Sequence, residues 1–380
     1  MPTHRVLILG TGAAGSAAAR ILAQHESLDI TLIGRSGAEP YTRMLIKSVA
    51  IGSTPPEVTR LPLPDVRFIA DTVVSVDAAS KRVLLRSGRM LAYDSLIVAT
   101  GSTPRDLPAD VADADAAQAG GFVTVLHSLK DALHIRRTLG GDRKRHVLVY
   151  GGGATAAETA SLLADAGHTV SLISRSAIPG ETAFGRELAL RIARLHHDRV
   201  TTRFGSALAS VRHDASTVTA HLADGDTLTG DLLVVAMGTI PLPPPPWDDA
   251  IEVDDRQQTS TVDVWAAGGV TSHIDARGPW RIDHWEDSAA QGSHAAHHLL
   301  HTRGLGSDPG PYLPRSSFLA LIHGHMLSGV GLTSVGSARR EPGDELIVVQ
   351  EGLDGIPVGA SGLDALLAVH QWRDRLHTTA

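Results

Sequence analysis

The chain has 380 residues, which is more than one hydrophobic core usually organises, so we expect two or three domains. It carries 34 basic and 41 acidic side chains, and this net charge of −7 argues against a nucleic-acid-binding protein. It contains no cysteine, which excludes disulfides, thiolate nucleophiles, CxxC redox pairs and cysteine-ligated metal centres, and which fits a cytoplasmic protein.

The first predicted elements are a strand, a glycine turn and a helix. Residues 6–9 are apolar and predict a buried strand, and Gly10-Thr-Gly12-Ala13-Ala14-Gly15 follows and opens an alanine-rich helix. A second apolar strand is expected at 30–33, with Arg35 just beyond it. In this order the pattern is typical of a turn that holds a dinucleotide diphosphate against a helix N-terminus. Alone, in a chain with 38 glycines, it could equally be a structural turn.

The same pattern returns in the middle of the chain. Residues 147–150 predict a strand, and Gly151-Gly-Gly153-Ala154-Thr-Ala156 leads into a helix and then a strand at 170–173, with Arg175 beyond it. Each copy continues into a hairpin and a buried strand that ends in Ala-x-Gly, at Gly101 and at Gly238. The repeat predicts an α/β fold with two Rossmann-like nucleotide-binding units, each with a β-meander insertion.

The last third of the chain carries fewer signals. His294, His297, His298 and His301 have helical spacing, which allows a metal site but favours a polar stripe, so we expect no metal. The proline-rich run at 241–247 is interpreted as a stiff connector. Every apolar run is shorter than the roughly 20 residues of a membrane span, so we expect no transmembrane helix.

Four further strings give the chain a family resemblance over about residues 4–335. They are Tyr41-Thr-Arg43-Met-Leu-Ile-Lys47, the run from 93 to 105, Val-Trp-Ala-Ala-Gly268-Gly269-Val at 264–270, and the run from His284 to Gly292. With them the chain resembles the two-dinucleotide flavoprotein reductases of the pyridine nucleotide-disulfide oxidoreductase fold, especially the ferredoxin and rubredoxin reductase branch.

The resemblance implies three domains and an NAD(P)H-dependent, FAD-containing oxidoreductase. The FAD domain would be discontinuous, at 1–115 and 233–310, around an NAD(P)H domain at 116–232. A short α+β domain at 311–380 would form the interface to an acceptor or to a second subunit, so a homodimer is possible. In this family FAD occupies the first nucleotide unit and NAD(P)H the second.

The resemblance also implies site residues. Gly10, Gly12 and Gly15 would hold the FAD diphosphate, Val74 would lie near its adenine, and Thr100 and Gly101 would pass beside the dinucleotide. Lys47 and Glu158 match the catalytic pair at which the nicotinamide stacks on the flavin, although each could instead be a solvated surface charge. The full set of implied cofactor-binding residues is Gly10, Gly12, Ala13, Ala14, Gly15, Arg43, Lys47, Val74, Thr100, Gly101, Gly151, Gly153, Ala154, Glu158, Arg175, Gly238, Gly268, Gly269 and Trp285.

Three departures from the family pattern affect these expectations. Arg35 and Ser36 stand where an acid normally binds the adenosine ribose, with Glu39 the nearest acid. Gly269 stands where the family places an aspartate on the flavin ribityl chain. The C-terminal part is short, and 319–325 replaces an aromatic-acidic string. The alternative is therefore a protein of the same fold that has lost FAD and acts as a sensor, scaffold or non-flavin enzyme.

The resemblance does not by itself specify NADPH or NADH as the electron donor, nor does it specify the electron acceptor. Arg175 replaces the acid that would bind the free 2′-hydroxyl of NADH, and its charge suits the 2′-phosphate of NADPH, so NADPH is favoured over NADH. The alternative is that Arg175 is simply an exposed arginine at a strand end. Without cysteine the flavin must reduce its acceptor directly, whether a ferredoxin or rubredoxin, a quinone, oxygen or a small molecule. His284 or His323 could take part in proton transfer near the ring.

Overall fold

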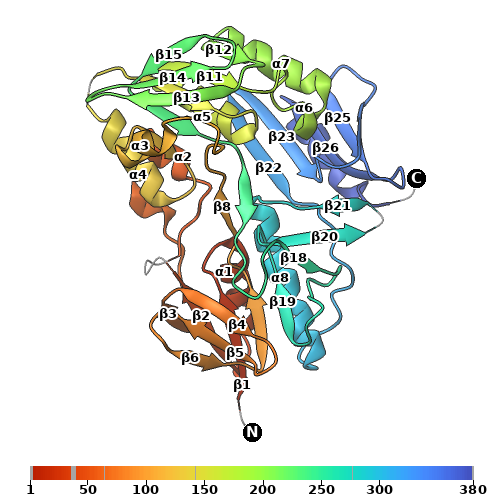
Figure 1. The fold of residues 1–380 in the computed structure, drawn as a ribbon. Helices are drawn as coiled ribbons and strands as arrows, with labels where there is room; N and C mark the ends of the chain where they lie inside the picture. Colours follow the sequence, from red (N-terminus) through yellow and green to blue (C-terminus); the bar gives the residue numbers. More distant parts are fainter. Residues whose placement is uncertain (1–2, 36–39, 64, 142, 276, 379–380) are drawn as a thin grey trace.

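The computed structural model describes residues 3–378 except 36–39, 64, 142 and 276. In Figure 1 one parallel sheet lies at the bottom and a second at the top, with an antiparallel C-terminal sheet beside the second. The predicted α/β fold, with two Rossmann-like units, two meanders and an α+β C-terminal domain, is confirmed.

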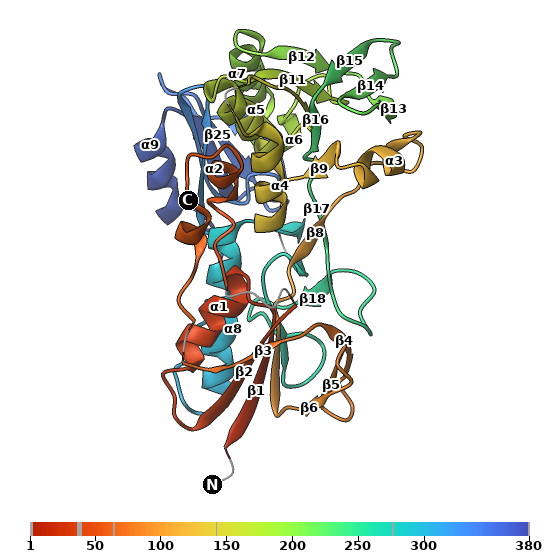
Figure 2. The same cartoon turned by 90° about the vertical axis from the view of Figure 1, so that its left-hand side faces the viewer.

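The first unit is a five-stranded parallel sheet in the order β19-β7-β1-β2-β3. The apolar run of β1 lies between β2 and β7 and is buried on both faces, because α1 and α8 pack on one face and the β-meander packs on the other. Helices α1 and α8 lie side by side in Figures 1 and 2, and a Cβ added to Gly292 of α8 would lie 2.1 Å from the Ala14 carbonyl oxygen. Only small residues permit so close a packing. The elements are β1 (His4–Leu9), α1 (Ala13–Leu22), β2 (Leu28–Gly34), α2 (Ile46–Ala50), the 3₁₀ helix Pro56–Thr59, β3 (Arg67–Ala70), β7 (Ser95–Val98), β19 (Val264–Ala266) and α8 (Trp285–Thr302).

The second unit repeats this architecture, with a parallel sheet in the order β12-β11-β10-β16-β9. Strand β16 pairs with β10 and β9, so the domain boundary expected between residues 232 and 233 falls inside a strand of this sheet. The second unit therefore continues at least to residue 235. Its elements are α3 (Ala114–Ala119), β9 (Val123–Val125), α4 (Leu129–Leu139), β10 (His146–Tyr150), α5 (Ala154–Asp165), β11 (Thr169–Ser174), α6 (Glu181–Phe184), α7 (Arg186–His197), β12 (Thr201–Phe204) and β16 (Leu232–Val235).

Both units carry the predicted antiparallel meander, and two short strands join the units. Strands β8 and β17 pair antiparallel in the middle of the molecule, where the chain enters and leaves the second unit (Figure 2). A small sheet, β18-β20-β21, lies between β17 and α8 in the sequence. The strands are β4 (Val73–Asp77), β5 (Arg82–Leu85), β6 (Met90–Ala92), β13 (Leu208–His213), β14 (Val218–Leu222), β15 (Thr227–Gly230), β8 (Ser102–Pro104), β17 (Thr239–Pro241), β18 (Ile251–Val253), β20 (Thr271–Asp275) and β21 (Gly278–Trp280).

The C-terminal unit is an antiparallel sheet in the order β22-β23-β26-β25-β24. One apolar cluster joins it to the second unit, with Phe184 and Leu188 packed against Ile322 and Val348. Phe318, near the start of β22, packs against the same cluster. The elements are β22 (Ser317–Ile322), β23 (His325–Gly331), β24 (Ser337–Arg340), β25 (Ile347–Glu351), β26 (Pro357–Leu363), α9 (Leu366–Gln371) and the 3₁₀ helix Trp372–Asp374.

Candidate active site

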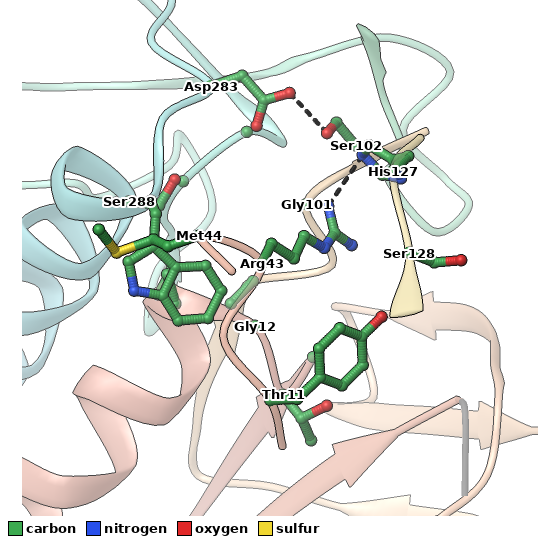
Figure 3. Close-up of a pocket in the computed structure, with 18 of the residues that line it drawn as sticks. Thr11, Gly12, Arg43, Met44, Gly101, Ser102, His127, Ser128, Asp283 and Ser288 are labelled. Atoms are coloured by element: carbon green, nitrogen blue, oxygen red, sulfur yellow. Dashed lines mark hydrogen bonds between the residues drawn. The ribbon is translucent and has the colours of Figure 1, made fainter. Parts of the chain in front are cut away.

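A large cavity of about 1960 Å³ lies where the three units meet (Figure 3). Its walls come from the first glycine turn, from α4 and α5 of the second unit, and from Phe318 and Leu319 at the start of β22. Pockets for one small ligand are usually about 300–1,000 Å³. The cavity therefore has room for more than one such ligand.

The first glycine turn forms one end of this cavity. Gly10 has a φ of +113°, and a Cβ there would lie 2.1 Å from the Ala99 carbonyl oxygen. A Cβ on Gly15 would lie 1.9 Å from the Gly10 carbonyl oxygen, whereas a Cβ on Gly12 would meet nothing within 4 Å. Two glycines are thus required by the fold, and the third leaves the backbone open to the cavity.

The N-terminus of α1 completes this end of the cavity. Its N-cap, Gly12, makes no side-chain capping bond, and Ala13 and Ala14 of its first turn line the cavity. The first backbone N–H groups of a helix have no partner within the helix and attract anions. This geometry can hold a diphosphate.

The second glycine turn repeats these contacts. A Cβ on Gly151 would lie 2.2 Å from the Ala236 carbonyl oxygen, while a Cβ on Gly153 would meet nothing within 4 Å. The N-cap of α5, Gly153, also lacks a side-chain capping bond. Helix α5 begins at Ala154, and its buried Ala156 takes the place of the third glycine. The second turn therefore has the same open backbone and uncapped helix start as the first, but Gly151, Gly153 and Ala154 lie outside the described cavity lining.

Lys47 of α2 and Glu158 of α5 form an ion pair on the cavity wall. Their side chains are 24% and 14% exposed, and the Glu158 carboxylate also faces the backbone N–H of Leu321 at 3.5 Å. Burial lowers the pKa of Lys47 to about 8, and the adjacent carboxylate acts in the opposite direction. The two residues predicted as a pair are brought together from two different units.

Arg43 extends into the cavity and meets His127, a residue that sequence reasoning missed. The Arg43 Nη1 donates to His127 Nε2 at 2.9 Å, as Figure 3 shows, so this ring nitrogen must be unprotonated. Burial and the charge of Arg43 lower the pKa of His127 to about 4. One sequence signal marked this region: the Ser128-x-x-Asp131 capping box predicts a helix that begins directly after His127.

The two histidines suggested for proton transfer have different surroundings. His284 lines the cavity, and burial together with the charge of Lys47 lowers its pKa to about 4, so it is neutral at pH 7. His323 is buried outside the described cavity lining, with its Nε2 3.0 Å from His196 Nδ1 of α7. Of these two histidines, His284 is the one that lines the cavity.

The proline-rich run does more than connect strands. The Thr100 hydroxyl donates to the Leu242 carbonyl oxygen at 2.6 Å, and the Leu242 N–H donates to the Gly101 carbonyl oxygen at 3.0 Å. These bonds hold Pro243, Pro244 and Pro245 as part of the cavity wall. The loop interpreted as a connector therefore shapes the site.

Seven residues predicted to bind cofactors lie outside the described cavity lining: Gly15, Val74, Gly151, Gly153, Ala154, Arg175 and Gly238. Val74 is 42% exposed on β4, while its neighbour Val73 lines the cavity. Gly238 follows β16, and its carbonyl oxygen accepts from the Arg105 N–H at 2.9 Å. Arg175 is exposed directly after β11.

The sequence lacks two acidic residues that the family pattern places on FAD, one for the adenosine ribose and one for the ribityl chain, and the structure differs at the two positions. Arg35 lines the cavity, as do the acidic residues Glu57 and Asp71, whereas Ser36 and Glu39 lie outside the described residues. At Gly269 an added Cβ would lie 2.3 Å from Oδ1 of Asp283. A carboxylate therefore already fills the place of the missing side chain.

The histidine stripe of α8 runs from the helix packing to the surface: His298 is buried, His294 is half-buried, and His297 and His301 are exposed. His298 is buried and accepts a hydrogen bond from the Trp265 indole N–H at 3.0 Å. Among the described residues, no group of three or more histidine, aspartate or glutamate side chains could hold a metal ion. Within the same described ranges, no helix is long and apolar enough to cross a membrane.

The residues present fit FAD in the first unit and a nicotinamide nucleotide in the second. The fit rests on the open backbone at Gly12 and Gly153, the uncapped starts of α1 and α5, and the cavity that connects the first turn with the Lys47–Glu158 pair. Of the residues predicted to bind cofactors, twelve line this cavity: Gly10, Gly12, Ala13, Ala14, Arg43, Lys47, Thr100, Gly101, Glu158, Gly268, Gly269 and Trp285.

Comparison with known proteins agrees with this geometry. The family model described as pyridine nucleotide-disulphide oxidoreductase matches residues 4–292. Rubredoxin-NAD(+) reductase of Pseudomonas putida is 27% identical over 346 residues, which is 86% of this chain and 86% of that protein.

Two solved structures show the same fold. The covalent putidaredoxin reductase–putidaredoxin complex aligns with 98% of this chain and 93% of the other chain at a TM-score of 0.85 and 24% identity. An engineered water-forming NADPH oxidase bound to NADPH aligns with 98% of this chain and 91% of the other at a TM-score of 0.79 and 19% identity.

The predicted activity class, an NAD(P)H-dependent flavoprotein oxidoreductase, is confirmed, and the alternative without FAD is not favoured. The absence of cysteine sets the chain apart from members that reduce a disulfide through their own dithiol. By its motifs, its fold and its family match over residues 4–292, the chain belongs to the pyridine nucleotide-disulphide oxidoreductase family.

Proposed function

We propose that this protein oxidises NADPH through bound FAD and reduces a small redox protein. The observation that carries the proposal is the Lys47–Glu158 pair, which lies on the wall of a cavity that begins at the first glycine turn. When bound, FAD accepts a hydride from the nicotinamide and releases electrons one at a time. The protein supplies binding, orientation and electrostatics.

Each end of the site has a distinct task in this proposal. Gly10, Gly12 and Gly15, with the first N–H groups of α1, bind the FAD diphosphate. Lys47 and Glu158 bind the nicotinamide carboxamide, because a paired ammonium and carboxylate offer it one donor and one acceptor. Trp285 and the prolines after Leu242 shield the reacting atoms from water.

The choice of NADPH rests on the end of β11. Ser174, Arg175 and Ser176 follow one another there, and Arg175 is exposed. The engineered NADPH oxidase carries three consecutive substitutions that replace Asp-Ala-Met by Ala-Arg-Ser. The same Arg-Ser pair is native to this chain, and an arginine fork suits the 2′-phosphate. The name of the rubredoxin reductase, in contrast, specifies NAD(+).

The acceptor must take electrons from the flavin without a protein dithiol in between. The chain has no cysteine, so this relay is chemically impossible within it. The relatives' names point to small iron–sulfur or iron proteins, rubredoxin and putidaredoxin, as acceptors of those proteins. A carrier of this kind is the acceptor we propose here. We also propose a cytoplasmic location, which suits a chain without cysteine.

An anaerobic spectral experiment tests the proposal. The purified protein should be yellow, should lose its flavin absorbance on addition of NADPH faster than on addition of NADH, and should regain it with an oxidised rubredoxin or ferredoxin. Quinones and oxygen serve as the comparison acceptors. A colourless protein that does not bind added FAD would refute the flavoprotein. Faster bleaching by NADH would refute the nucleotide choice alone.

A further inference from the structure

We propose that Asp283 binds the ribityl hydroxyl groups of FAD and replaces the carboxylate that residue 269 lacks. The inference rests on the proposed binding of FAD in this cavity. It concerns two positions that are far from the glycine turn in sequence and that meet only in the folded chain.

The side chain of Asp283 occupies the space of a residue-269 side chain. A Cβ built on Gly269 would lie 2.3 Å from Oδ1 and 2.9 Å from Cγ of Asp283. Gly269 follows β19 and Asp283 precedes α8, and the β20–β21 hairpin between them returns the chain to the same point. Arg281 fixes this return, because its Nε donates to the Gly269 carbonyl oxygen at 3.0 Å. Carboxylates at both positions would collide, so the two residues form an exchange pair.

The two oxygens of Asp283 differ in their hydrogen bonds. Oδ2 accepts from Ser102 Oγ at 2.6 Å, from Arg281 Nη2 at 3.1 Å and from the Thr239 hydroxyl. Oδ1 accepts none from the residues that the structure describes, and it is the atom nearest to the Gly269 position. Figure 3 shows the bond to Ser102 at the cavity wall. One oxygen thus holds the carboxylate in place, and the other offers its lone pairs to a ligand.

The charge of Asp283 selects the kind of ligand group. Burial opposes ionisation, but the hydrogen bonds from Ser102 and Thr239 and the charge of Arg281 outweigh it and hold the pKa of this carboxyl below its usual value. An ionised carboxylate only accepts hydrogen bonds and repels phosphate. Its side chain is 25% exposed, toward the cavity that it lines. The partner must therefore be a hydroxyl or N–H group.

The position of Asp283 identifies that group. It precedes His284, which is close enough to Lys47 for the ammonium charge to lower the pKa of the imidazole. On its other side, its Oδ1 lies at the Gly269 position, and a Cβ on the adjacent Gly268 would lie 3.2 Å from the Cβ of Ala14 in the first turn of α1. A diphosphate at Gly12 and a ring near Lys47 leave the ribityl chain between them. The adenosine ribose lies on the other side of the diphosphate.

The test compares FAD affinity among apoprotein variants by titration of flavin fluorescence. Asp283→Ala and Asp283→Asn should raise the Kd roughly ten- to hundred-fold, which is the effect of losing one charge-assisted hydrogen bond. The double variant Asp283→Ala, Gly269→Asp should return to within a few-fold of wild type, because the new carboxylate enters the vacated space. Glu252→Gln, at an exposed acid of β18 outside the described cavity lining, should leave the Kd unchanged.

The results distinguish a failure of the proposed function, FAD binding, from a failure of the proposed role of Asp283. Wild-type protein that binds no FAD would overturn the proposed function. Wild-type protein that binds FAD while Asp283→Ala binds it equally well would overturn the role of Asp283 alone. A double variant as weak as Asp283→Ala, with an apoprotein melting temperature equal to wild type, would overturn the exchange of carboxylates.

Discussion

Gly12 and Gly15 lie three residues apart in the same turn, yet substitution by alanine should affect different properties of the protein. A Cβ on Gly12 meets no protein atom within 4 Å, and its φ of −73° is open to any residue. A Cβ on Gly15 lies 1.9 Å from the Gly10 carbonyl oxygen and 2.9 Å from its carbon. We therefore expect Gly12→Ala to weaken FAD binding and Gly15→Ala to weaken the fold.

The magnitudes follow from these contacts. For Gly12→Ala the lost preference for glycine at an N-cap and the reduced entropy of the unfolded chain are each below about 1 kcal/mol and oppose each other. The methyl group instead separates the diphosphate from the backbone, and losing a hydrogen bond to a charged group costs about 1.5–3 kcal/mol, or roughly 10- to 150-fold in Kd. For Gly15→Ala the clash is with backbone that cannot rotate away, which costs about 1–3 kcal/mol of folding stability.

The test compares the FAD-free forms of Gly12→Ala, Gly15→Ala and the wild-type protein. Thermal melts followed by circular dichroism report the fold, and titration of flavin fluorescence reports FAD affinity. Gly12→Ala should have the same melting temperature as the wild-type protein and should bind FAD at least about tenfold more weakly. Gly15→Ala should melt several degrees lower. A Gly12→Ala protein with wild-type FAD affinity would refute the assignment of the diphosphate to this turn, and a Gly15→Ala protein with wild-type melting would refute the packing argument.

Three further results are expected. Lys47→Met should retain FAD but slow anaerobic flavin reduction by NADPH about tenfold or more in stopped flow, since one charged partner is lost; an unchanged rate contradicts its role. Arg175→Gln should lower kcat/KM for NADPH about tenfold or more while leaving that for NADH nearly constant, and equal losses for both nucleotides would contradict 2′-phosphate recognition. His273 is 3% exposed and stacks on Trp280 at 3.7 Å, and burial and the charge of Arg277 lower its pKa to about 3. In the unfolded chain this histidine becomes protonated below about pH 6.5, whereas in the folded protein it stays neutral. The free energy of unfolding is therefore unaffected above that pH and is lower by about 2 kcal/mol at pH 5. His273→Phe should therefore flatten the loss of melting temperature between pH 6.5 and 5, whereas the same change at the exposed His370 should not.

The parts of this protein that the sequence predicts are those set by local chemistry. Gly10 and Gly15 are required by contacts within a few residues or with the adjacent strand, and β1 is apolar throughout because it is buried on both faces. The repeat of this unit from Gly151 indicates the second sheet. The Lys47–Glu158 pair was predicted only because both residues match a family pattern; neither has a local signal.

The tertiary structure alone decides which distant side chains share the cavity. Arg43 meets His127 from another unit, and Ser102 meets Asp283 across the junction of β8 and α8. The sequence at Gly269 indicates a lost carboxylate, whereas in the folded chain Asp283 fills the same volume. A sequence pattern records what each position carries, but the location of a charge depends on the packing of segments far apart in the chain. For this reason the missing anchor could be noticed from the sequence, and its replacement only from the structure.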